Sequence, residues 1–153
     1  MTQLAAVANY SYLDAIGTFP NSLAIRQAVR VLLIEDNRSD VFMVSRMLRD
    51  AAHPNAFEMV DAPRLSDALE LLDTQHFDII LLDLNLLDMD GVASVAALHA
   101  EAPHTPIIVH SGTHDPQMRR EALMCGARHY LVKGRESAFS LRFMIGQALK
   151  AKA

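Results

Sequence analysis

The sequence predicts an α/β domain in which a parallel β-sheet lies between two layers of helices. Five short apolar segments recur between residue 30 and the C-terminus, and a stretch with helical spacing of apolar residues follows each of them. Most of these segments are continuous apolar runs without alternation, which is typical of parallel strands buried on both faces. Buried strands that alternate strictly with helices indicate right-handed crossovers and hence a doubly wound sheet.

The first part of this region is expected to supply three strands and two helices. One apolar run ends directly at Glu35 and Asp36, and another ends at Asp83. Ser39 or Asp40 carries a side-chain oxygen of the kind that favours a helix start. The elements expected here, in order, are a strand at 31–34, a helix from 39 or 40 to about 51, a strand at 56–60, a helix at 65–74 and a strand at 79–82.

Turn and cap residues delimit the elements of the second part. Asp88 and Gly91 carry turn chemistry after the third strand. Asp115 with Pro116, and later Ser137, are typical of helix starts. The elements expected here, in order, are a helix from 92 to about 100, a strand at 107–110, a helix from 116 to near 126, a strand at 129–132 and a helix from 138 to about 150.

Residues 1–29 differ from the domain at 30–153 and are interpreted as an N-terminal extension. Apolar residues between Leu4 and Ile16 fall at weak helical spacing, and a second short helix is conceivable from Asn21 or Ser22 to Val29. Two interpretations stay open: a loosely ordered arm, and a pair of helices that packs on the domain or on a second copy. No group of side chains in this extension predicts any chemistry.

Composition excludes several classes of function. The net charge is −4 and no dense Lys/Arg block occurs, so no direct nucleic-acid surface is expected. The single cysteine, Cys125, excludes an internal disulfide and agrees with a reducing compartment. No apolar run reaches the ~18 residues of a membrane span, and the N-terminus lacks the pattern of a secretory signal. We therefore expect a cytoplasmic protein with no membrane segment.

Five strands favour the flavodoxin-like order 2-1-3-4-5 among doubly wound sheets. In this order the carboxyl ends of strands 1 and 3 are neighbours, so Glu35, Asp36 and Asp83 should converge on one crevice. Strand 4 should bring Ser111 beside them, and strand 5 should bring Lys133. Ligands bind outside the carboxyl ends of the strands in such sheets, which makes this cluster the candidate site.

The chemistry of this cluster follows from its charges. Carboxylates packed together repel one another unless a cation is present, and an all-oxygen ligand set with room for water suits Mg²⁺. Lys133 can balance a dianionic group bound beside the metal, and the Ser111 hydroxyl can hydrogen-bond the same group. Asp83 then faces a space of phosphoryl size, as carboxylate nucleophiles do in aspartyl-phosphate chemistry. We infer transfer of a phosphoryl group to Asp83.

The segment from residue 30 to the end resembles the receiver domain of a two-component response regulator of the chemotaxis type. The resemblance covers about four fifths of the chain. It lies in four motifs, each at a predicted strand end: LLIEDN, LLDLNL, IVHSGT and HYLVKG. One such motif would be weakly specific, but four in the right order make accidental agreement improbable.

The resemblance implies a signalling protein that accepts phosphate rather than an enzyme. Asp83 would receive the phosphoryl group from a histidine kinase, a phosphotransfer protein or a small phosphodonor. Asp36, Asp83 and the backbone carbonyl of Asn85 would hold Mg²⁺, and Glu35 would contribute directly or through water.

The resemblance also implies a switch. Lys133 would contact the phosphoryl group, Ser111 would shift toward it, and Tyr130 would change rotamer to alter a surface built from the fourth helix, fifth strand and fifth helix of the domain. Asn85 and Thr113 occupy positions that tune hydrolysis in similar proteins. A downstream protein partner, supplied in trans, would then recognise the altered surface.

Two departures from the family pattern affect the loops around the cluster. Leu87 stands where proline is common, so the loop after the third strand loses a fixed φ and is expected to be more mobile. Gly134 stands where proline commonly follows the lysine in a cis peptide. A cis bond without proline costs ~2.5–4 kcal/mol, so the Lys133–Gly134 bond should be trans.

Several alternatives stay open at this point. One alternative to a phosphoryl-accepting receiver is a phosphorylation-independent interaction module with a receiver fold. Another is a receiver fragment of a larger sensor kinase or cyclic-di-nucleotide enzyme, because receivers joined to such proteins have a similar Lys-Gly motif. Homodimer formation is also open. A phosphohydrolase with an Asp nucleophile is disfavoured, because that class typically has a second Asp where this chain has Asn85.

The remaining side chains are interpreted mainly as structural. Met43 and Met124 are expected to fill the core. Phe42 is interpreted as a partly buried packing residue, with contact to a kinase or phosphotransfer protein as the alternative. His110 and His114 lie around a strand end, and no pair of histidines has zinc-ligand spacing on a helix.

Overall fold

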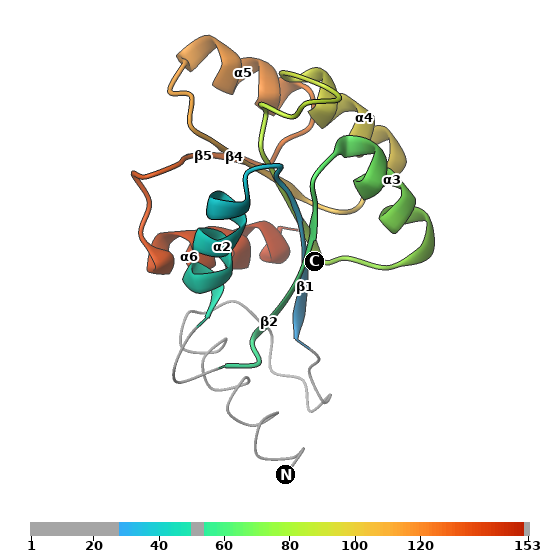
Figure 1. The fold of residues 1–153 in the computed structure, drawn as a ribbon. Helices are drawn as coiled ribbons and strands as arrows, with labels where there is room; N and C mark the ends of the chain where they lie inside the picture. Colours follow the sequence, from blue (N-terminus) through green and yellow to red (C-terminus); the bar gives the residue numbers. More distant parts are fainter. Residues whose placement is uncertain (1–27, 50–53, 152–153) are drawn as a thin grey trace.

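Five parallel strands form one sheet in the order β2-β1-β3-β4-β5, and helices cover both of its faces (Figure 1). The computed structural model describes residues 28–49 and 54–151, so both interpretations of the extension concern residues outside the described ranges, except Ala28 and Val29. The elements are β1 (Val29–Ile34), α2 (Arg38–Leu48), β2 (Phe57–Ala62), α3 (Leu65–Thr74), β3 (Ile79–Leu82), α4 (Ala93–Glu101), β4 (Ile107–Ser111), α5 (Pro116–Met124), β5 (His129–Val132) and α6 (Ala138–Lys150). The predicted class and strand order are confirmed.

Burial on both faces explains the continuous apolar runs. All four residues of β3 are fully buried in the centre of the sheet. Because successive side chains of a strand point to opposite faces, Ile80 and Leu82 join a core with α3, α4 and α5. Ile79 and Leu81 join a second core with α2 and α6 on the other face. Each face needs apolar side chains at its own positions, so no polar alternation remains.

Some element bounds differ from the prediction for identifiable reasons. β2 extends to Ala62 because it pairs along the whole of β1, from Val29↔Phe57 to Ile34↔Ala62. The polar Asp61 interrupts the apolar pattern before Ala62 and so concealed this extension. Val29, expected at the end of a short helix, is instead the first residue of β1.

Helix starts follow the side-chain caps, with one correction. The cap of α2 is Asn37, whose side chain accepts hydrogen bonds from the backbone N–H groups of Ser39 and Asp40, rather than either of those residues. α2 ends at Leu48, since Arg49 has extended backbone angles. Ser137 caps α6 as predicted, and it does so in a reciprocal capping box with Ser140.

Two features lie at the amino end of the sheet: a close contact at Gly126 and a hydrogen-bond network around Arg30. Gly126 follows α5 with φ +120°, and a Cβ added there would lie 2.7 Å from Cγ of His99 on α4. Arg30 on β1 donates its backbone N–H to Asp78 at 2.8 Å. The Arg30 guanidinium contacts Glu58, the carbonyl of His76, the side chain of Gln75 and the ring of Phe77.

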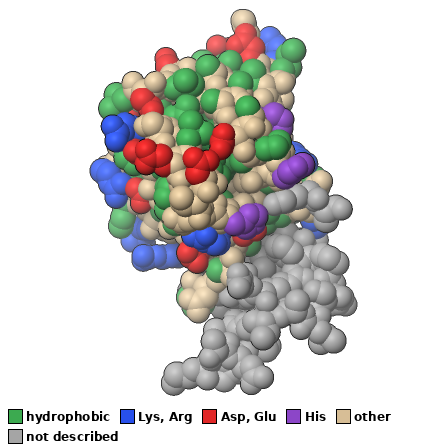
Figure 2. Space-filling view, turned by 90° about the vertical axis from the view of Figure 1, so that its right-hand side faces the viewer, with side chains coloured by type: hydrophobic (Ala, Val, Ile, Leu, Met, Phe, Trp, Pro, Cys, Tyr) green, Lys and Arg blue, Asp and Glu red, His purple; other side chains and the backbone are tan. Residues whose placement is uncertain are grey.

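No described helix is long and apolar enough to cross a membrane. Figure 2 turns the right-hand side of Figure 1 toward the viewer and shows the face that α3 and α4 cover. Acidic and apolar side chains are interspersed on this face, and Lys and Arg lie toward its margins.

Candidate functional site

Three carboxylates meet at the carboxyl end of the sheet. Glu35 and Asp36 follow β1, Asp83 follows β3, and one candidate ligand oxygen from each lies within 4.8 Å of the others. The adjacent strands fix this arrangement, because Ile34 pairs with Leu82 and the Asp83 N–H donates to the Ile34 carbonyl at 3.0 Å. Glu35 and Asp83 are 1% and 4% exposed, so both carboxyl groups are largely shielded from water.

Lys133 enters the same cluster from the end of β5. Its Nζ donates a hydrogen bond to Glu35, donates another to Asp40 at 2.9 Å, and lies 3.5 Å from Oδ2 of Asp83. The Lys133 backbone N–H donates to the Ser111 carbonyl at 2.9 Å, which continues the β4–β5 ladder to the lysine. The structure therefore brings the cation and the phosphoacceptor candidate into contact.

Asp40 is a member of the cluster that the sequence interpretation missed. It was considered only as a helix-opening residue, yet its side chain contacts the lysine across 93 positions of sequence. Asp40 follows Asp36 by four residues and lies in the first turn of α2. A helix that begins just after a strand keeps its first turn near the strand's carboxyl end. The four-residue spacing from Asp36 was therefore the sequence signal that could have identified Asp40.

Burial disfavours the charged forms of both Glu35 and Lys133, whereas the hydrogen bond between them favours both charged forms. Burial raises the pKa of Glu35, and the hydrogen bond from Lys133 only partly offsets that effect. For Lys133, burial disfavours the charged form, but the hydrogen bonds to Glu35 and Asp40 outweigh it and raise the pKa. Lys133 therefore remains an ammonium group at any pH at which the protein functions.

The cluster carries more negative than positive charge. The cluster holds four carboxyl groups: Glu35, Asp40 and Asp83 contact the Lys133 ammonium, and Asp36 lies beside Glu35 and Asp83. With one ammonium group, full ionisation leaves three unbalanced negative charges. Like charges at this separation in a partly buried site repel strongly. A divalent cation with oxygen ligands relieves that repulsion, which is the chemical argument that the residues fit Mg²⁺.

The residues predicted to switch lie on β4, β5 and the loop after β4. Ser111 is fully buried, and its Oγ accepts a hydrogen bond from the Thr113 N–H at 3.3 Å. Tyr130 is 5% exposed and its hydroxyl donates to the Thr113 carbonyl at 2.8 Å. Tyr130 thus faces inward and is tied to the loop that begins at Ser111.

The loop after β3 is held by a residue that the sequence interpretation treated as part of a turn. Both Asp88 carboxylate oxygens accept backbone hydrogen bonds, from Leu65 and Ser66 at 3.0 Å each, and thereby cap α3. Burial opposes ionisation of Asp88, but these bonds outweigh it and hold its pKa below the usual value. Asn85, two residues beyond Asp83, is exposed and donates its N–H to Oδ1 of Asp83 at 3.3 Å.

The turn after Lys133 has the predicted trans geometry, since the described part of the chain contains no cis peptide bond. Gly134 adopts φ +81°, a conformation that glycine accepts readily, and a Cβ there would meet open space. Glycine therefore turns the chain by a positive φ at the position where related sequences commonly have proline.

Some side chains outside the cluster correct the sequence interpretation. Phe42 is 62% exposed rather than partly buried, and the Arg46 guanidinium lies 5.8 Å from its ring centroid. Met124 and Met43 are 87% and 41% exposed, so neither is a core residue. These exposed side chains lie on α2 and α5, and other residues of the same helices contact the core.

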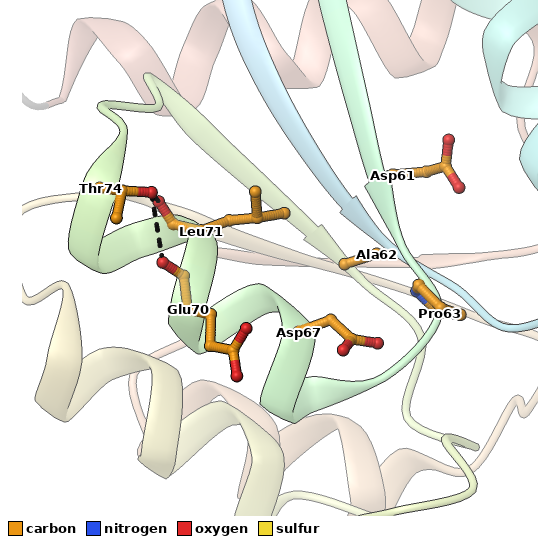
Figure 3. A pocket seen from close by; sticks show the side chains of 7 residues that line it. All are labelled: Asp61, Ala62, Pro63, Asp67, Glu70, Leu71 and Thr74. Carbon is orange, nitrogen blue, oxygen red and sulfur yellow. Dashed lines mark hydrogen bonds between the residues drawn. The ribbon is translucent and has the colours of Figure 1, made fainter.

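A separate hollow of about 370 Å³ lies along β2 and α3 (Figure 3). Two of its acidic side chains have ion-pair partners: Arg38 pairs with Asp61, and Arg64 pairs with Asp67. The Thr74 hydroxyl donates to the Glu70 carbonyl at 3.4 Å. This hollow lies apart from the carboxylate cluster and contains none of the predicted site residues.

Comparison with known proteins agrees with the architecture. Residues 31–139 match the family model of the response regulator receiver domain. The regulatory protein AtoC of Escherichia coli K12 is 31% identical over 104 residues, which is 68% of this chain and 22% of AtoC. The cell cycle transcriptional regulator CtrA of Caulobacter vibrioides is 30% identical over 105 residues, which is 69% of this chain and 44% of CtrA. The chain thus matches less than half the length of these relatives.

Solved structures of receiver domains share the fold. A CheY-like receiver domain protein from Methanospirillum hungatei JF-1 superposes with a TM-score of 0.72 at 21% identity, covering 82% of this chain and 97% of that one. The receiver domain of the sensor histidine kinase PA1611 from Pseudomonas aeruginosa PAO1, solved with a magnesium ion in its active site cleft, gives 0.68 at 22% identity, covering 80% and 98%. From its strand order and the family match together, this chain belongs to the response regulator receiver domain family.

Proposed function

We propose that this chain accepts a phosphoryl group on Asp83 from a histidine kinase or a phosphotransfer protein, and that it signals in the cytoplasm through a changed protein surface. The observation that supports this proposal most is the contact of Lys133 with Asp83 inside a cluster of acids. An ammonium beside a nucleophilic carboxylate stabilises the negative charge of an incoming phosphoryl group. The acids alone would repel that group.

The residues proposed to hold Mg²⁺ are Glu35, Asp36, Asp83 and, through its backbone carbonyl, Asn85. When bound, the ion supplies positive charge to the phosphoryl oxygens and neutralises the acids. Magnesium lies in the active site cleft of the PA1611 receiver, which has the same fold. In this chain Glu35 and Asp36 leave β1 side by side and face Asp83, so the protein ligands come from two adjacent strands.

The proposed transfer is a displacement at phosphorus. An oxygen of the Asp83 carboxylate attacks the phosphorus atom, a new P–O bond forms, and the bond from phosphorus to the donor breaks. The leaving group keeps that electron pair, so no redox step or further reactant is needed. Lys133 holds the transferred phosphoryl oxygens, and the Ser111 hydroxyl donates a hydrogen bond to them after it leaves the Thr113 N–H.

The proposed switch uses the Tyr130 contact. When Ser111 moves toward the phosphoryl group, the segment that reaches Thr113 moves with it, and the hydrogen bond from Tyr130 to the Thr113 carbonyl is lost or changed. Tyr130 then changes rotamer and alters the surface of α5, β5 and α6, where a downstream protein binds in trans. Asn85 and Thr113, which border the phosphoryl space, set the rate of hydrolysis.

Phe42 is proposed as a contact for the phosphodonor protein. It is exposed on α2, the helix that starts directly after the acidic pair. A large exposed aromatic side chain is an effective anchor at a protein interface. Phe42→Ser should slow transfer from a phosphotransfer protein and leave labelling by acetyl phosphate unchanged, which separates docking from chemistry.

The central test is labelling of the full chain by acetyl phosphate with Mg²⁺, followed by intact mass measurement. The protein should gain one phosphoryl group, and Asp83→Asn should gain none. Asp90→Asn is the matched control, because Asp90 is an exposed carboxylate in the same loop. Labelling of the Asp83→Asn protein to the wild-type extent would contradict the assignment. A labelled protein with unchanged oligomeric state and partner affinity would favour the phosphorylation-independent interaction module.

A further inference from the structure

A buried histidine–carboxyl pair lies on the opposite side of β4 from the Tyr130 network. His110, 1% exposed, is the residue before Ser111, and its Nε2 is hydrogen-bonded to Oε1 of Glu136 from the loop between β5 and α6. The Glu136 side chain is 6% exposed. The sequence interpretation considered His110 only as a zinc ligand and did not consider Glu136.

This pair is poorly suited to stabilising the core. Of the buried side-chain oxygen and nitrogen atoms in the described ranges, only Glu136 Oε2 has no hydrogen-bond partner. Whichever group of the pair holds the proton, that oxygen remains without a partner, and a buried unsatisfied polar atom is costly. Apolar residues of similar size commonly replace such pairs without loss of stability. A different contribution must explain the pair.

The pair connects the two elements that carry Ser111 and Lys133. The loop leaves β5 at Lys133, whose N–H is bonded to the Ser111 carbonyl, and enters α6 after Ser137. Between them Gly134 has no side chain and Arg135 is exposed, so Glu136 is the loop side chain that reaches the sheet. Its partner His110 lies on β4 next to Ser111. The loop is therefore attached to β4 twice, through the Lys133 backbone and through the Glu136 side chain.

The loop needs such an anchor because its backbone is permissive. A proline after the lysine would fix φ, whereas Gly134, at φ +81°, is the residue type that restricts the backbone least. Lysine has a flexible side chain, so the position of its ammonium depends on the backbone from which it extends. Without the Glu136 anchor the loop could move away from β4 and carry Lys133 with it.

We propose that Glu136, held by His110, is a positioning residue that keeps the Lys133 ammonium against Asp83 and so sets the rate of phosphoryl transfer. This inference rests on the proposed function of Asp83. The step itself is unchanged: the Asp83 oxygen bonds to the phosphorus of acetyl phosphate, the bond between that phosphorus and the acetyl oxygen breaks, and acetate leaves with the electron pair. The pair acts only through the geometry of Lys133.

The test compares initial rates of labelling by acetyl phosphate at saturating Mg²⁺, in the full chain, for wild type and variants. The double variant His110→Leu with Glu136→Leu replaces the pair by apolar groups. It should label about tenfold more slowly, because misplaced catalytic groups lose rate steeply. Its thermal midpoint should not fall, and its Mg²⁺ affinity should match wild type, since the proposed metal ligands follow β1 and β3 rather than β4 or β5.

Two single variants keep the test decisive if the double variant does not fold. Glu136→Asp shortens the reach by one methylene group and should also label slowly. Glu136→Gln keeps the length and a hydrogen-bonding group and should recover most of the rate lost in Glu136→Asp. Arg135→Gln, an exposed change in the same loop, serves as the matched control and should label like wild type.

The outcomes separate this inference from the proposed function. If wild type itself is not labelled, the proposed function fails. If wild type is labelled and the double variant or Glu136→Asp labels equally fast, the positioning role is refuted. If rate, thermal midpoint and Mg²⁺ affinity all fall in parallel in every folded Glu136 variant, the pair is merely structural and the inference is likewise overturned.

Discussion

The two ends of the sheet each contain a basic residue among acids, and they differ in charge balance. At the amino end, the Arg30 guanidinium pairs with Glu58, whose side chain is 58% exposed, and the Arg30 backbone N–H donates to Asp78. At the carboxyl end, Lys133 contacts three carboxyl groups, those of Glu35, Asp40 and Asp83, while Asp36 adds a fourth beside Glu35 and Asp83, and the Lys133–Glu35 pair is largely buried.

This difference distinguishes a structural network of charges from a ligand-binding site. Solvent screens the Arg30 network and its charges nearly cancel, so it needs no further ligand. The Lys133 network holds buried excess negative charge, a condition that a fold retains at a stability cost unless a cation relieves it. Similar residue types at the two ends therefore indicate different roles, and four measurements can break or sharpen this contrast.

The largest expected effect follows from removing the cation of the unbalanced end. Lys133→Met should lower the free energy of unfolding by about 3 kcal/mol in the presence of EDTA, because it leaves buried carboxylates without their partner. Urea unfolding measures this loss. Added Mg²⁺ should restore part of it, since the ion replaces the missing positive charge. Equal stability of the variant and wild type in EDTA would show that the acids do not depend on Lys133.

The next effect compares two glycines with positive φ at opposite ends of β5. Gly126→Ala should cost about 2 kcal/mol, from backbone strain and from the clash with His99. Gly134→Ala should cost about 1 kcal/mol, from strain alone, because its Cβ would meet open space. Thermal unfolding compares the two, and His99→Ala should remove the difference. If Gly134→Ala proves the more costly of the two, the open turn described after Lys133 is wrong.

A smaller effect concerns the cap that holds the loop after Asp83. Asp88→Ala should cost about 1 kcal/mol at pH 7, the usual contribution of a helix cap. Because hydrogen bonds from Leu65 and Ser66 hold the Asp88 pKa below its usual 3.8, this contribution is present above pH 3.8 and is lost as the pH falls through the lower folded-state value. Unfolding curves of both proteins should therefore converge in acid, and a difference that persists at the lowest pH would contradict the assignment.

The smallest effect is expected at the balanced end. Arg30→Met keeps apolar contact with Phe77 and removes only a screened ion pair and solvent-exposed hydrogen bonds, so it should cost about 0.5 kcal/mol. The loss should shrink further in high salt. Urea unfolding at two salt concentrations provides the measurement. A loss as large as that of Lys133→Met would erase the contrast between the two ends.

The sequence was sufficient for features that depend on local pattern. Continuous apolar runs predicted the strands, and polar residues directly after them placed Glu35, Asp36 and Asp83 at one edge, because parallel strands share their carboxyl end. Ser137 marked the start of α6 by its own side chain. In each case the signal and the structure it specifies lie within a few residues.

The features that were missed depend on contacts between distant segments. Asp88 caps a helix that starts 23 residues before it, and His110 pairs with Glu136 across 26 residues. Nothing near these residues in sequence distinguishes them from ordinary turn or strand residues. Phe42 was placed wrongly for a related reason: helical spacing assigns a residue to a face, but only the packed neighbours decide whether that face is covered.

The outward turn at Gly134 has a practical consequence. Because Arg135, the next residue, is exposed and the chain contains no tryptophan, a single indole or a small environment-sensitive dye introduced at residue 135 would give a clean optical signal. Such a reporter would lie two residues from Lys133 and would follow the arrival of a phosphoryl group beside that ammonium in real time, without a radioactive donor.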